Sequence, residues 1–557
     1  MEEPRTGTAP DFRVAEYARA LPYLRPYAGS LTLIILASLV ATGTGLISPL
    51  MNQWLIDEGL LGRNFRVLCI AAAAMAGLTA FGFVLNAWSS YTYVRVSARV
   101  LFEMRLELYR HLQRVAPRYH AKARMGDLIS RLSNDVAEVQ RVSADVLLAL
   151  LANVVFLVGA VFLMLRISPL LFLVSIALIP LSLWLTRIAQ HRLARHVKRL
   201  RERSASIGSF LIESLTGLRL TVLSNAQERE AERFRDENSC FISALMSMQL
   251  ANFLAGAIPT GATTLSTSAV FLVGGSQVLS GELTLGALVA FLAYHGRLLS
   301  PVQNLMSLYG SLVTGAVSLR RMFEVLEVPI EVEEPPDPVR VERWRGEVEF
   351  RGVEFDYCGQ PVLRGVDLRL EPGQTFILTG PSGAGKSTLA DLLVRLCDPT
   401  AGSIRLDGHD LRSISLADLR HQIAVVEQTP VLFHGTIRDN IAYARPGASG
   451  EDLARAAHEA SLTLPLDTMV GERGTALSAG ERQRIAIARM LLRDPRVVVL
   501  DEPVSALDSA TRASIRETLA HALQGRTALV ITHDPGVADG ELLHLEHGVI
   551  GRVCQPA

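Results

Sequence analysis

The chain has 557 residues, of which 49% are hydrophobic, and its 55 basic and 55 acidic side chains cancel. It is too long for one hydrophobic core, so at least two domains are expected. The composition excludes collagen-like and disordered proteins. The five cysteines are scattered, without a CxxC or a Cys/His cluster, so neither a disulfide framework nor a zinc site is indicated. Near residue 330 the charge divides, with 31 Lys+Arg against 22 Asp+Glu before it and 24 against 33 after it. A basic half therefore precedes an acidic half.

The first half contains long apolar runs rather than one-sided stripes. Each run holds about 20 mostly uncharged residues, the length of a helix that crosses a hydrocarbon core of roughly 30 Å. The six predicted spans are residues 29–51, 67–90, 144–165, 168–188, 252–273 and 284–310. Pro259, Gly256, Gly261 and a Thr/Ser-rich stretch interrupt the fifth apolar run, and we expect His295 and Arg297 to make the lower end of the sixth span polar. A buried core helix is the alternative interpretation of any one run.

Two long segments between the spans, residues 95–141 and 192–235, contain ten Lys+Arg each. Basic loops stay in the cytoplasm, so both termini and both long loops are predicted to face it. Helical spacing continues through both loops, and their tips lie at residues 117–126 and near Gly217. These helical hairpins are either solvated surface or the places where a soluble domain presses on the membrane domain. Residues 1–28 show no cleavage pattern and match neither a signal nor a transit peptide.

A proline-rich acidic stretch, VPIEVEEPPDPVR, occupies residues 328–340. Its prolines prevent both a helix and a packed strand, so it is predicted to be a linker. Beyond it, short β-branched runs such as QTFILTG, VVVLDE and ALVITH alternate with helical stretches. This pattern predicts an α/β domain with a largely parallel sheet whose strand ends carry the chemistry.

The segment GPSGAGKST lies between a strand-like and a helical stretch. Glycines at this spacing let backbone N–H groups surround an anion, Lys386 adds a positive charge, and Ser387 offers a hydroxyl ligand to Mg²⁺. Only three of the 55 basic residues are lysines, so a chance match is rarer here than in most chains. The predicted nucleotide-binding residues of this phosphate-binding loop are Gly380, Pro381, Ser382, Gly383, Ala384, Gly385, Lys386, Ser387 and Thr388.

The segment VVVLDE, residues 497–502, carries two acidic side chains to the end of an apolar strand. There Asp501 is placed to hold Mg²⁺, and Glu502 is placed to polarise an attacking water as general base. An acidic pair after a strand is a weak signal alone. Together with the phosphate-binding loop it predicts nucleotide hydrolysis, which needs both a phosphate site and a metal and water site.

With these motifs in this order, the second half resembles the ATPase domain of ABC transporters. LSAGERQR, residues 477–484, is similar to the family signature, Gln428 in VVEQ resembles the Q-loop, residues 505–508 (SALD) resemble the D-loop, and His533 in ITHD resembles the switch histidine. Residues 119–136 and 213–223 of the first half resemble the two intracellular loops of ABC exporters. The resemblance thus covers nearly the whole chain.

The resemblance implies a role for each matching residue. These are Glu502, His533 and Gln428 for catalysis, Ser387, Gln428 and Asp501 for the metal, and Tyr357, Ser478, Gly480 and Asp508 for the nucleotide. Tyr357 would stack on adenine, while Ser478 and Gly480 would contact ATP held by a second subunit. Ala479 and Glu481 depart from the glycine and glutamine usual in the signature, and a methyl group facing a phosphate would either be tolerated or weaken the closed dimer.

The predicted fold is a polytopic α-helical membrane domain with six transmembrane helices and long cytoplasmic extensions, followed by an α/β P-loop ATPase domain. Its predicted boundaries are 1–28 for the cytoplasmic segment, 29–327 for the membrane domain, 328–340 for the linker and 341–557 for the nucleotide-binding domain. One ATPase per chain calls for a dimer, a homodimer first and an obligate heterodimer as the alternative. Nucleic acid is not an expected partner, because the ATPase half is acidic.

The expected function is export of a small molecule, lipid or peptide across the cell membrane, driven by ATP with Mg²⁺, with the ATPase in the cytoplasm. An ATP-gated channel or membrane-bound regulator is the alternative of a different class. The polar residues in or near the spans either line a cavity or form hydrogen bonds between helices; they are Asn86, Asn153, Asn252, His295, Arg297, Gln303 and Asn304. The sequence leaves the substrate open.

Overall fold

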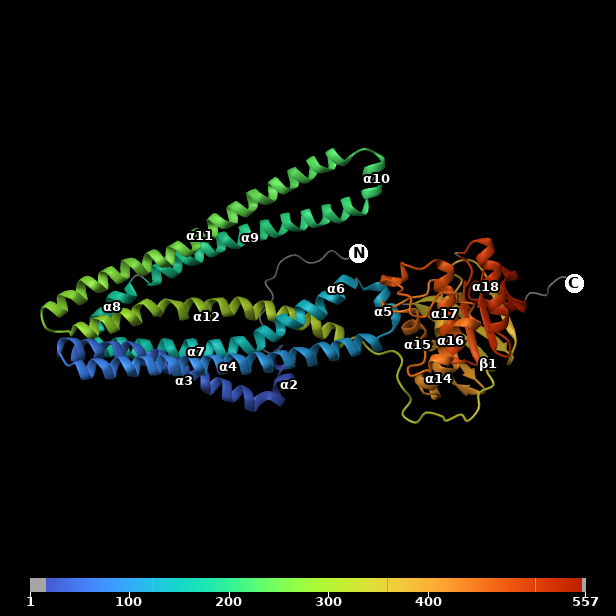
Figure 1. Ribbon diagram of the computed structural model, residues 1–557, viewed down its shortest axis with the longest axis horizontal. Helices are drawn as coiled ribbons and strands as arrows, with labels where there is room; N and C mark the ends of the chain where they lie inside the picture. Colours follow the sequence, from blue (N-terminus) through green and yellow to red (C-terminus); the bar gives the residue numbers. More distant parts are fainter. Residues whose placement is uncertain (1–16, 124, 178, 358, 506, 553–557) are drawn as a thin grey trace. The chain divides into compact units, whose positions relative to one another are not determined.

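The computed structural model describes residues 17–123, 125–177, 179–357, 359–505 and 507–552. Three parts of the predictions lie outside the described residues: residues 1–16 of the cytoplasmic segment, Cys358, and Ala506 of the D-loop. By their internal contacts the residues form two units, Met1–Arg110 with Gly126–Leu326, and His111–Met125 with Glu327–Ala557. Figure 1 shows the elements of both units.

The first unit is helical throughout its described residues. Its helices are α2 (Leu21–Leu24), η1 (Arg25–Tyr27), α3 (Ala28–Trp54), η2 (Leu55–Leu61), α4 (Phe65–Arg114), α6 (Met125–Ser130), η3 (Arg131–Asp135), α7 (Val136–Ile167), α8 (Pro169–Ala177), α9 (Ile179–Thr216), α10 (Leu218–Leu223), α11 (Gln227–Leu279) and α12 (Leu285–Leu326). Within the described ranges, six helical stretches are long and apolar enough to cross a membrane. The prediction of six spans is therefore confirmed.

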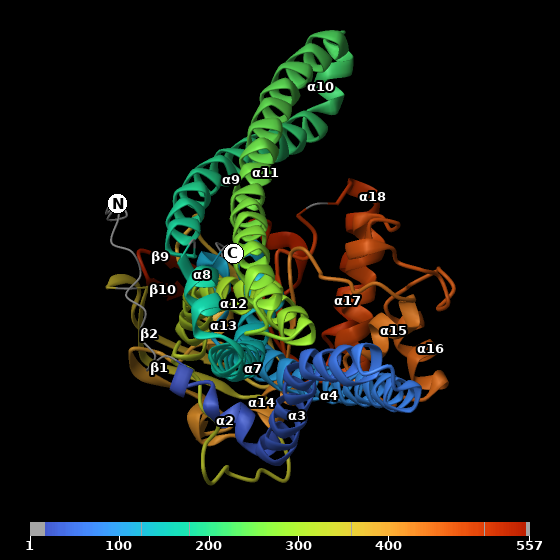
Figure 2. The same cartoon turned by 90° about the vertical axis from the view of Figure 1, so that its left-hand side faces the viewer.

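The helices α4 and α11 run well past a bilayer. At 1.5 Å per residue, the 53 residues of α11 and the 50 of α4 give rods far longer than a hydrocarbon core of roughly 30 Å. Figures 1 and 2 both show α9 and α11 running side by side to a tip at α10. The helical extension predicted for the second long loop is therefore present in the structure.

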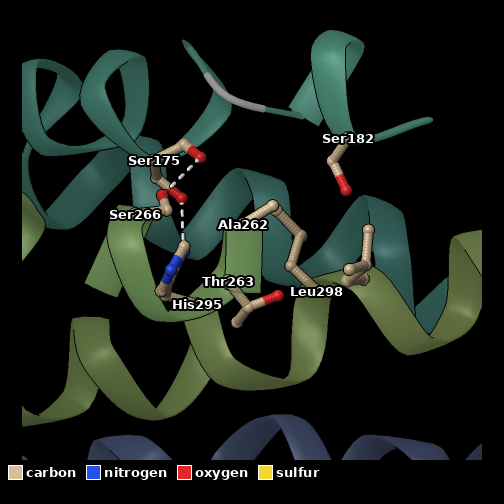
Figure 3. Close-up of a pocket in the computed structure, with 8 residues that line it drawn as sticks. Ser175, Ser182, Ala262, Thr263, Ser266, His295 and Leu298 are labelled. Carbon is tan, nitrogen blue, oxygen red and sulfur yellow. Dashed lines mark hydrogen bonds between the residues drawn. The ribbon is translucent and has the colours of Figure 1, made fainter. Parts of the chain in front are cut away.

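The fifth span is present in spite of Pro259, because α11 continues through this residue, which is buried. A proline within a helix removes one backbone hydrogen bond, and packing on neighbouring helices can outweigh that loss. Three of the polar spanning residues join helices: Asn304 Nδ2 donates to Asn153 Oδ1 at 3.3 Å, and His295 forms a hydrogen bond with Ser175 (Figure 3).

The second unit combines strands and helices. Its strands are β1 (Val348–Tyr357), β2 (Gln360–Leu370), β3 (Thr375–Thr379), β4 (Ala401–Leu406), β5 (His409–Asp410), β6 (Ile423–Val426), β7 (Val497–Asp501), β8 (Thr527–Ile531), β9 (Glu541–Glu546) and β10 (Val549–Arg552). Its helices are α5 (Pro117–Lys122), α13 (Lys386–Leu393), η4 (Leu411–Ser413), α14 (Leu416–Gln422), α15 (Ile437–Ala442), α16 (Gly450–Glu459), η5 (Glu472–Gly474), α17 (Ala479–Arg493), α18 (Ser509–Ala522) and η6 (Pro535–Val537).

The larger sheet has the order β10-β9-β3-β8-β7-β6, and β9, β3, β8, β7 and β6 pair in parallel. Its central strands are apolar on both faces, as expected of strands covered by helices on both sides. Parallel strands bring their carboxyl ends to one edge, where open α/β sheets bind ligands. The segments that follow β3, β8, β7 and β6 must therefore meet at that edge.

The linker predicted at residues 328–340 contains neither helix nor strand. It is nonetheless tied to the second unit, because the Glu333 carbonyl accepts from Arg395 and the Glu334 carboxylate accepts from the Leu416 amide at 3.0 Å. The tip of the first long loop belongs to the same unit, and Arg118 on α5 donates to Glu331 at 2.7 Å. This tip therefore packs with the soluble domain, which favours the second of the two interpretations of the loop tips.

Candidate functional site

The glycine loop between β3 and α13 has a backbone that side chains would obstruct. At Gly380 φ is +154° and an added Cβ would lie 2.2 Å from the Leu545 carbonyl oxygen, while Gly385 has φ +104° and would meet Val362. Both positions require glycine for space as well as conformation. The loop ends where the first N–H groups of α13 have no intrahelical acceptor, an arrangement suited to phosphate oxygens.

Lys386 begins α13 and is buried with its charge turned toward the loop. Its Nζ donates to the carbonyls of Gly380 and Pro381, both at 2.9 Å. These bonds satisfy the buried ammonium group and hold the two ends of the loop together. The scarce lysine is thus positioned at the centre of the predicted phosphate site.

The loop and β7 meet at a pair of oxygen ligands. Ser387 Oγ donates to Asp501 Oδ2 at 3.2 Å. Burial raises the pKa of the Asp501 carboxyl above its usual value, while Ser387 and Lys386 act in the opposite direction. A hydroxyl and a carboxylate are the hard oxygen ligands that Mg²⁺ prefers, and a cation between them would offset the burial of the carboxylate. The residues present therefore fit a magnesium ion.

The residue after Asp501 is the centre of a second cluster. Glu502 Oε2 accepts from Gln428 Nε2 at 2.9 Å, and its other oxygen, Oε1, lies 3.1 Å from His533 Nε2. Gln428 follows β6 and also reaches Ser505 Oγ at 3.2 Å, and His533 follows β8. The three residues that the resemblance marks as catalytic are thus gathered at the carboxyl edge of three neighbouring strands.

The backbone of Glu502 lies in the left-handed region, with φ +45°. Its amide donates to the Ile531 carbonyl on β8 at 2.8 Å, which helps to hold this conformation. A non-glycine residue with such a φ is strained, and strained residues of this kind cluster at functional sites. The turn directs the carboxylate toward the ends of β6 and β8 rather than along β7.

Tyr357 closes β1 on the far side of the glycine loop. Its hydroxyl lies 3.5 Å from Thr388 Oγ1, and its ring meets Phe355 edge to face with centroids 4.9 Å apart. The ring is half-buried, so one part is anchored in the core and the remainder is open. The geometry places an aromatic surface near the start of α13, as the predicted adenine contact requires.

The signature segment forms the N-terminus of α17. Ser478 Oγ accepts from the Glu481 amide, while Glu481 Oε2 accepts from Ser478 N and Oγ, both at 2.8 Å. Glu481 thus completes a capping box, a role that glutamine at this position would also fill. Ala479 is half-buried and packs against the helical core, so its methyl group is partly turned inward.

Two further predicted residues support neighbouring helices. An added Cβ at Gly480 would lie 2.6 Å from Thr511 Cγ2, so glycine is needed for α17 and α18 to approach closely. Asp508 caps α18, its Oδ2 accepting from the Thr511 amide at 3.1 Å. The D-loop and the signature are therefore joined through Thr511.

The sequence did not single out Asp391, which lies on α13 one turn after Ser387. Burial, and then the charges of Asp501 and Glu427, raise the pKa of its carboxyl to about 6. A raised carboxyl pKa next to Asp501, the aspartate predicted to hold Mg²⁺, marks a site where negative charge accumulates. No motif includes this position, and only the assembled fold brings these carboxylates together.

Taken together, the fold and the site define a P-loop ATPase domain joined to a helical membrane domain. Residues 31–302 match the family model of the ABC transporter transmembrane region, and residues 363–505 match the ABC transporter family model. The chain is 31% identical to the ATP-dependent lipid A-core flippase of Idiomarina loihiensis over 96% of this chain and 94% of that protein. It is 32% identical to an uncharacterised ABC transporter ATP-binding protein of Bacillus subtilis, over 92% and 90% of the two chains.

Among solved structures, a bacterial Atm1-family ABC exporter with ATP bound superposes with a TM-score of 0.74, at 26% identity and over 95% of each chain. The chain belongs to the ABC transporter family. It is a membrane-embedded half-transporter of the exporter type, it binds ATP, and ATP hydrolysis drives its export function. Half-transporters of this family typically function as dimers.

Proposed function

We propose that the protein is a homodimeric exporter of the cell membrane whose ATPase domains lie in the cytoplasm. The lipid A-core flippase and exporter relatives support transport across a membrane. Two basic segments, residues 95–141 and 192–235, support the orientation, since Lys and Arg are retained on the cytoplasmic side. The exported substrate is a small molecule, a lipid or a peptide, and the lipid A-core flippase relative supports the lipid.

The hairpin of α9, α10 and α11 supports a dimer. Its tip exposes large apolar side chains, with Ile212 at 72%, Leu220 at 70% and Leu223 at 73%. Apolar side chains clustered at the end of a long helical extension are characteristic of a contact surface. We assign this surface to the soluble domain of the second subunit. A single purified species with full ATPase activity would support the homodimer over the heterodimer.

We assign ATP to the glycine loop, with Lys386 against its phosphates, Tyr357 against its adenine, and Ser478 and Gly480 acting from the second subunit. Ser387, Asp501 and Gln428 would hold Mg²⁺, which neutralises charge on the phosphates when bound. Glu502 accepts a proton from the attacking water as general base. Gln428 and His533 orient that carboxylate through their contacts with its two oxygens.

The observation that carries this assignment is the contact of Glu502 with both Gln428 and His533. Replacing Glu502 by Gln retains the shape and the bond-forming oxygen but removes the base, so steady-state hydrolysis should fall by about 10²–10⁴-fold. ATP binding should be retained. Turnover by purified Glu502→Gln protein in lipid equal to that of the wild type would refute the role of general base.

A further inference from the structure

The first long loop contains a wide helical turn, η3, between α6 and α7. Its residues, Arg131–Asp135, are π-helical. A π-helical turn has one residue more than an α-helical turn, so it places the side chains and carbonyls around it differently from a regular helix. Such turns are rare and are found frequently at functional sites. The contacts of η3 with neighbouring helices indicate what this turn positions.

Arginine side chains join η3 to two other helices through the backbone. Arg105 on α4 donates to the carbonyl of Leu132 through Nε at 3.1 Å, and to that of Ser133 through Nη2 at 3.0 Å. Arg131, on η3 itself, donates through Nη1 to the carbonyl of Arg321 on α12 at 2.7 Å. A guanidinium group holds its donors in one rigid plane, so these contacts fix orientation as well as distance.

The last residue of η3 is a buried carboxylate. Asp135 is only 6% exposed, and both of its partners come from α12. Arg321 Nη1 lies 2.9 Å from Asp135 Oδ2, and Ser318 Oγ donates to Asp135 Oδ1 at 3.1 Å. A carboxylate this deeply buried is unfavourable without a counter-charge and hydrogen-bond donors. Asp135 is therefore tied to one place on α12.

Arg321 also reaches α6, on the other side of the wide turn. Its Nη2 donates to Asp127 Oδ1, and Asp127 Oδ2 accepts from Arg131 Nε at 2.8 Å. The hydrogen bond from Arg131 lowers the pKa of the Asp127 carboxyl below its usual value, which keeps this partner ionised. Arg131 Nη1 lies 3.3 Å from Glu324 Oε2, a further carboxylate of α12. Arg321 thus bridges a carboxylate before the turn and a carboxylate at its end.

Stability alone does not account for this cluster. Apolar side chains of similar volume are often at least as stabilising as a buried ion pair, because the loss of hydration can exceed the attraction between the charges. The best-attested effect of such a pair is register, since its contacts are satisfied in one alignment of two helices and broken in the others. Here the register is that of α6 and η3 on the last part of α12, which ends at Leu326.

We propose that Arg321 and Asp135 are positioning residues of the transport cycle, which hold η3 in one register on α12 so that a movement of the loop tip is passed to α12. This role rests on the ATP-driven movement of the proposed function. The tip, which packs with the ATPase domain, leads into α6, and α12 is a candidate span. With the register fixed, α12 follows the tip. When either side chain is neutralised, η3 can slide on α12 and part of the movement is lost.

The first test measures the movement at two places in the full chain in lipid. The five native cysteines are replaced by serine, and one spin label per chain is attached to Gln524→Cys on the ATPase domain or to Ser307→Cys on α12, both exposed positions. Double electron–electron resonance gives the distance between the two labels of a dimer, with and without ATP. The parent chain carries Glu502→Gln, so that bound ATP is retained.

We expect ATP to change the distance at both sites in the parent chain. In Asp135→Asn and Arg321→Gln the change at Gln524 should persist, while the change at Ser307 falls by at least half. Arg320→Gln, which removes the exposed arginine next to Arg321, is the matched control and should preserve both changes. A change at Ser307 equal to that of the parent chain in both cluster variants would overturn the proposal. A parent chain without any change at Gln524 would refute the ATP-driven dimer itself, and the proposal with it.

The second test asks whether the two side chains act as one pair. Apparent melting temperatures in lipid are measured for Asp135→Asn, Arg321→Gln and the double variant. We expect the double variant to lose clearly less than the sum of the single losses, because either change breaks the same contact. Additive losses would contradict a direct pair. Should Arg321→Gln fail to fold, Arg321→Lys takes its place in both tests, since it keeps the charge but loses the planar group that spans both carboxylates.

Discussion

Gln428 donates its side-chain N–H to Glu502 at 2.9 Å, which joins the segment after β6 to the end of β7. The two residues are 74 positions apart in the sequence, and the parallel pairing of β6 with β7 brings them together. The backbone of Glu502, with a φ of +45°, also turns its side chain toward β6. A movement of the segment that carries Gln428 therefore reorients the carboxylate to which we assign the role of general base.

Gln428→Ala is expected to lower kcat for ATP hydrolysis by about 10–100-fold while changing KM for ATP much less. It removes the bonds to Glu502 and Ser505 and one of the three proposed Mg²⁺ ligands, but it leaves the glycine loop that holds the phosphates intact, so kcat should change more than KM. Steady-state kinetics of the purified protein in lipid separate the two constants. Gln524→Ala, an exposed glutamine far along the chain, serves as control. A change confined to KM would contradict an orienting role.

Ser387→Ala is expected to raise the Mg²⁺ concentration needed for half-maximal ATPase activity by roughly 10–100-fold, as for the loss of a residue from a metal site. The hydroxyl that contacts Asp501 at 3.2 Å is removed. Ser387→Thr retains this hydroxyl and should keep most of the wild-type Mg²⁺ dependence. If both variants required the same Mg²⁺ concentration, steric disturbance of the loop would explain the effect better than the loss of a ligand.

The sequence was sufficient for features that depend on local pattern. The six spans follow from length and hydropathy, and Lys386 and Asp501 follow from motifs next to strands. The sheet order that sets His533 beside Glu502 depends on pairing across the domain, which no local pattern contains. That α11 continues through Pro259 is likewise not visible in a local pattern, since tertiary packing decides whether a proline ends a helix in a membrane domain.

Asp391 was missed for the same physical reason. Its neighbours Asp501 and Glu427 come from distant parts of the sequence, and burial contributes most to its raised pKa. The contact of Gly480 with Thr511 is likewise visible only in the fold, although the signature resemblance marked the glycine. Residues identified by motif were thus predictable, and residues that support them through packing were not.

Asp391→Asn is expected to stabilise the protein above pH 6 and to leave it unchanged near pH 4. The pKa of Asp391 is about 6, above its ordinary value of 3.8, so the fold favours the protonated form. Its stabilising contribution is therefore complete below pH 4 and is lost as pH rises through 6, by up to roughly 2 kcal/mol after solvent screening. Asparagine is neutral throughout and avoids this loss.

The measurement is the apparent melting temperature of the ATPase domain between pH 4 and 8, with EDTA present so that no Mg²⁺ compensates the carboxylates. Asp539→Asn removes an exposed carboxylate and should not flatten the pH profile. A profile for Asp391→Asn parallel to that of the wild type would show that the charge of this residue does not oppose folding.

Gly480→Ala is expected to destabilise the ATPase domain by about 1–3 kcal/mol, as overpacking in a tight contact does. The added methyl carbon would lie 2.6 Å from Thr511 Cγ2, forcing α17 and α18 apart. Thr511→Ser removes that Cγ2 and keeps the backbone amide that bonds Asp508, so the double variant should regain most of the lost stability. Gly450→Ala, whose Cβ would meet no atom within 4 Å, is the matched control. The measurement is thermal unfolding of the wild type, Gly480→Ala, the double variant and Gly450→Ala. If Thr511→Ser fails to restore the stability that Gly480→Ala loses, the clash lies elsewhere.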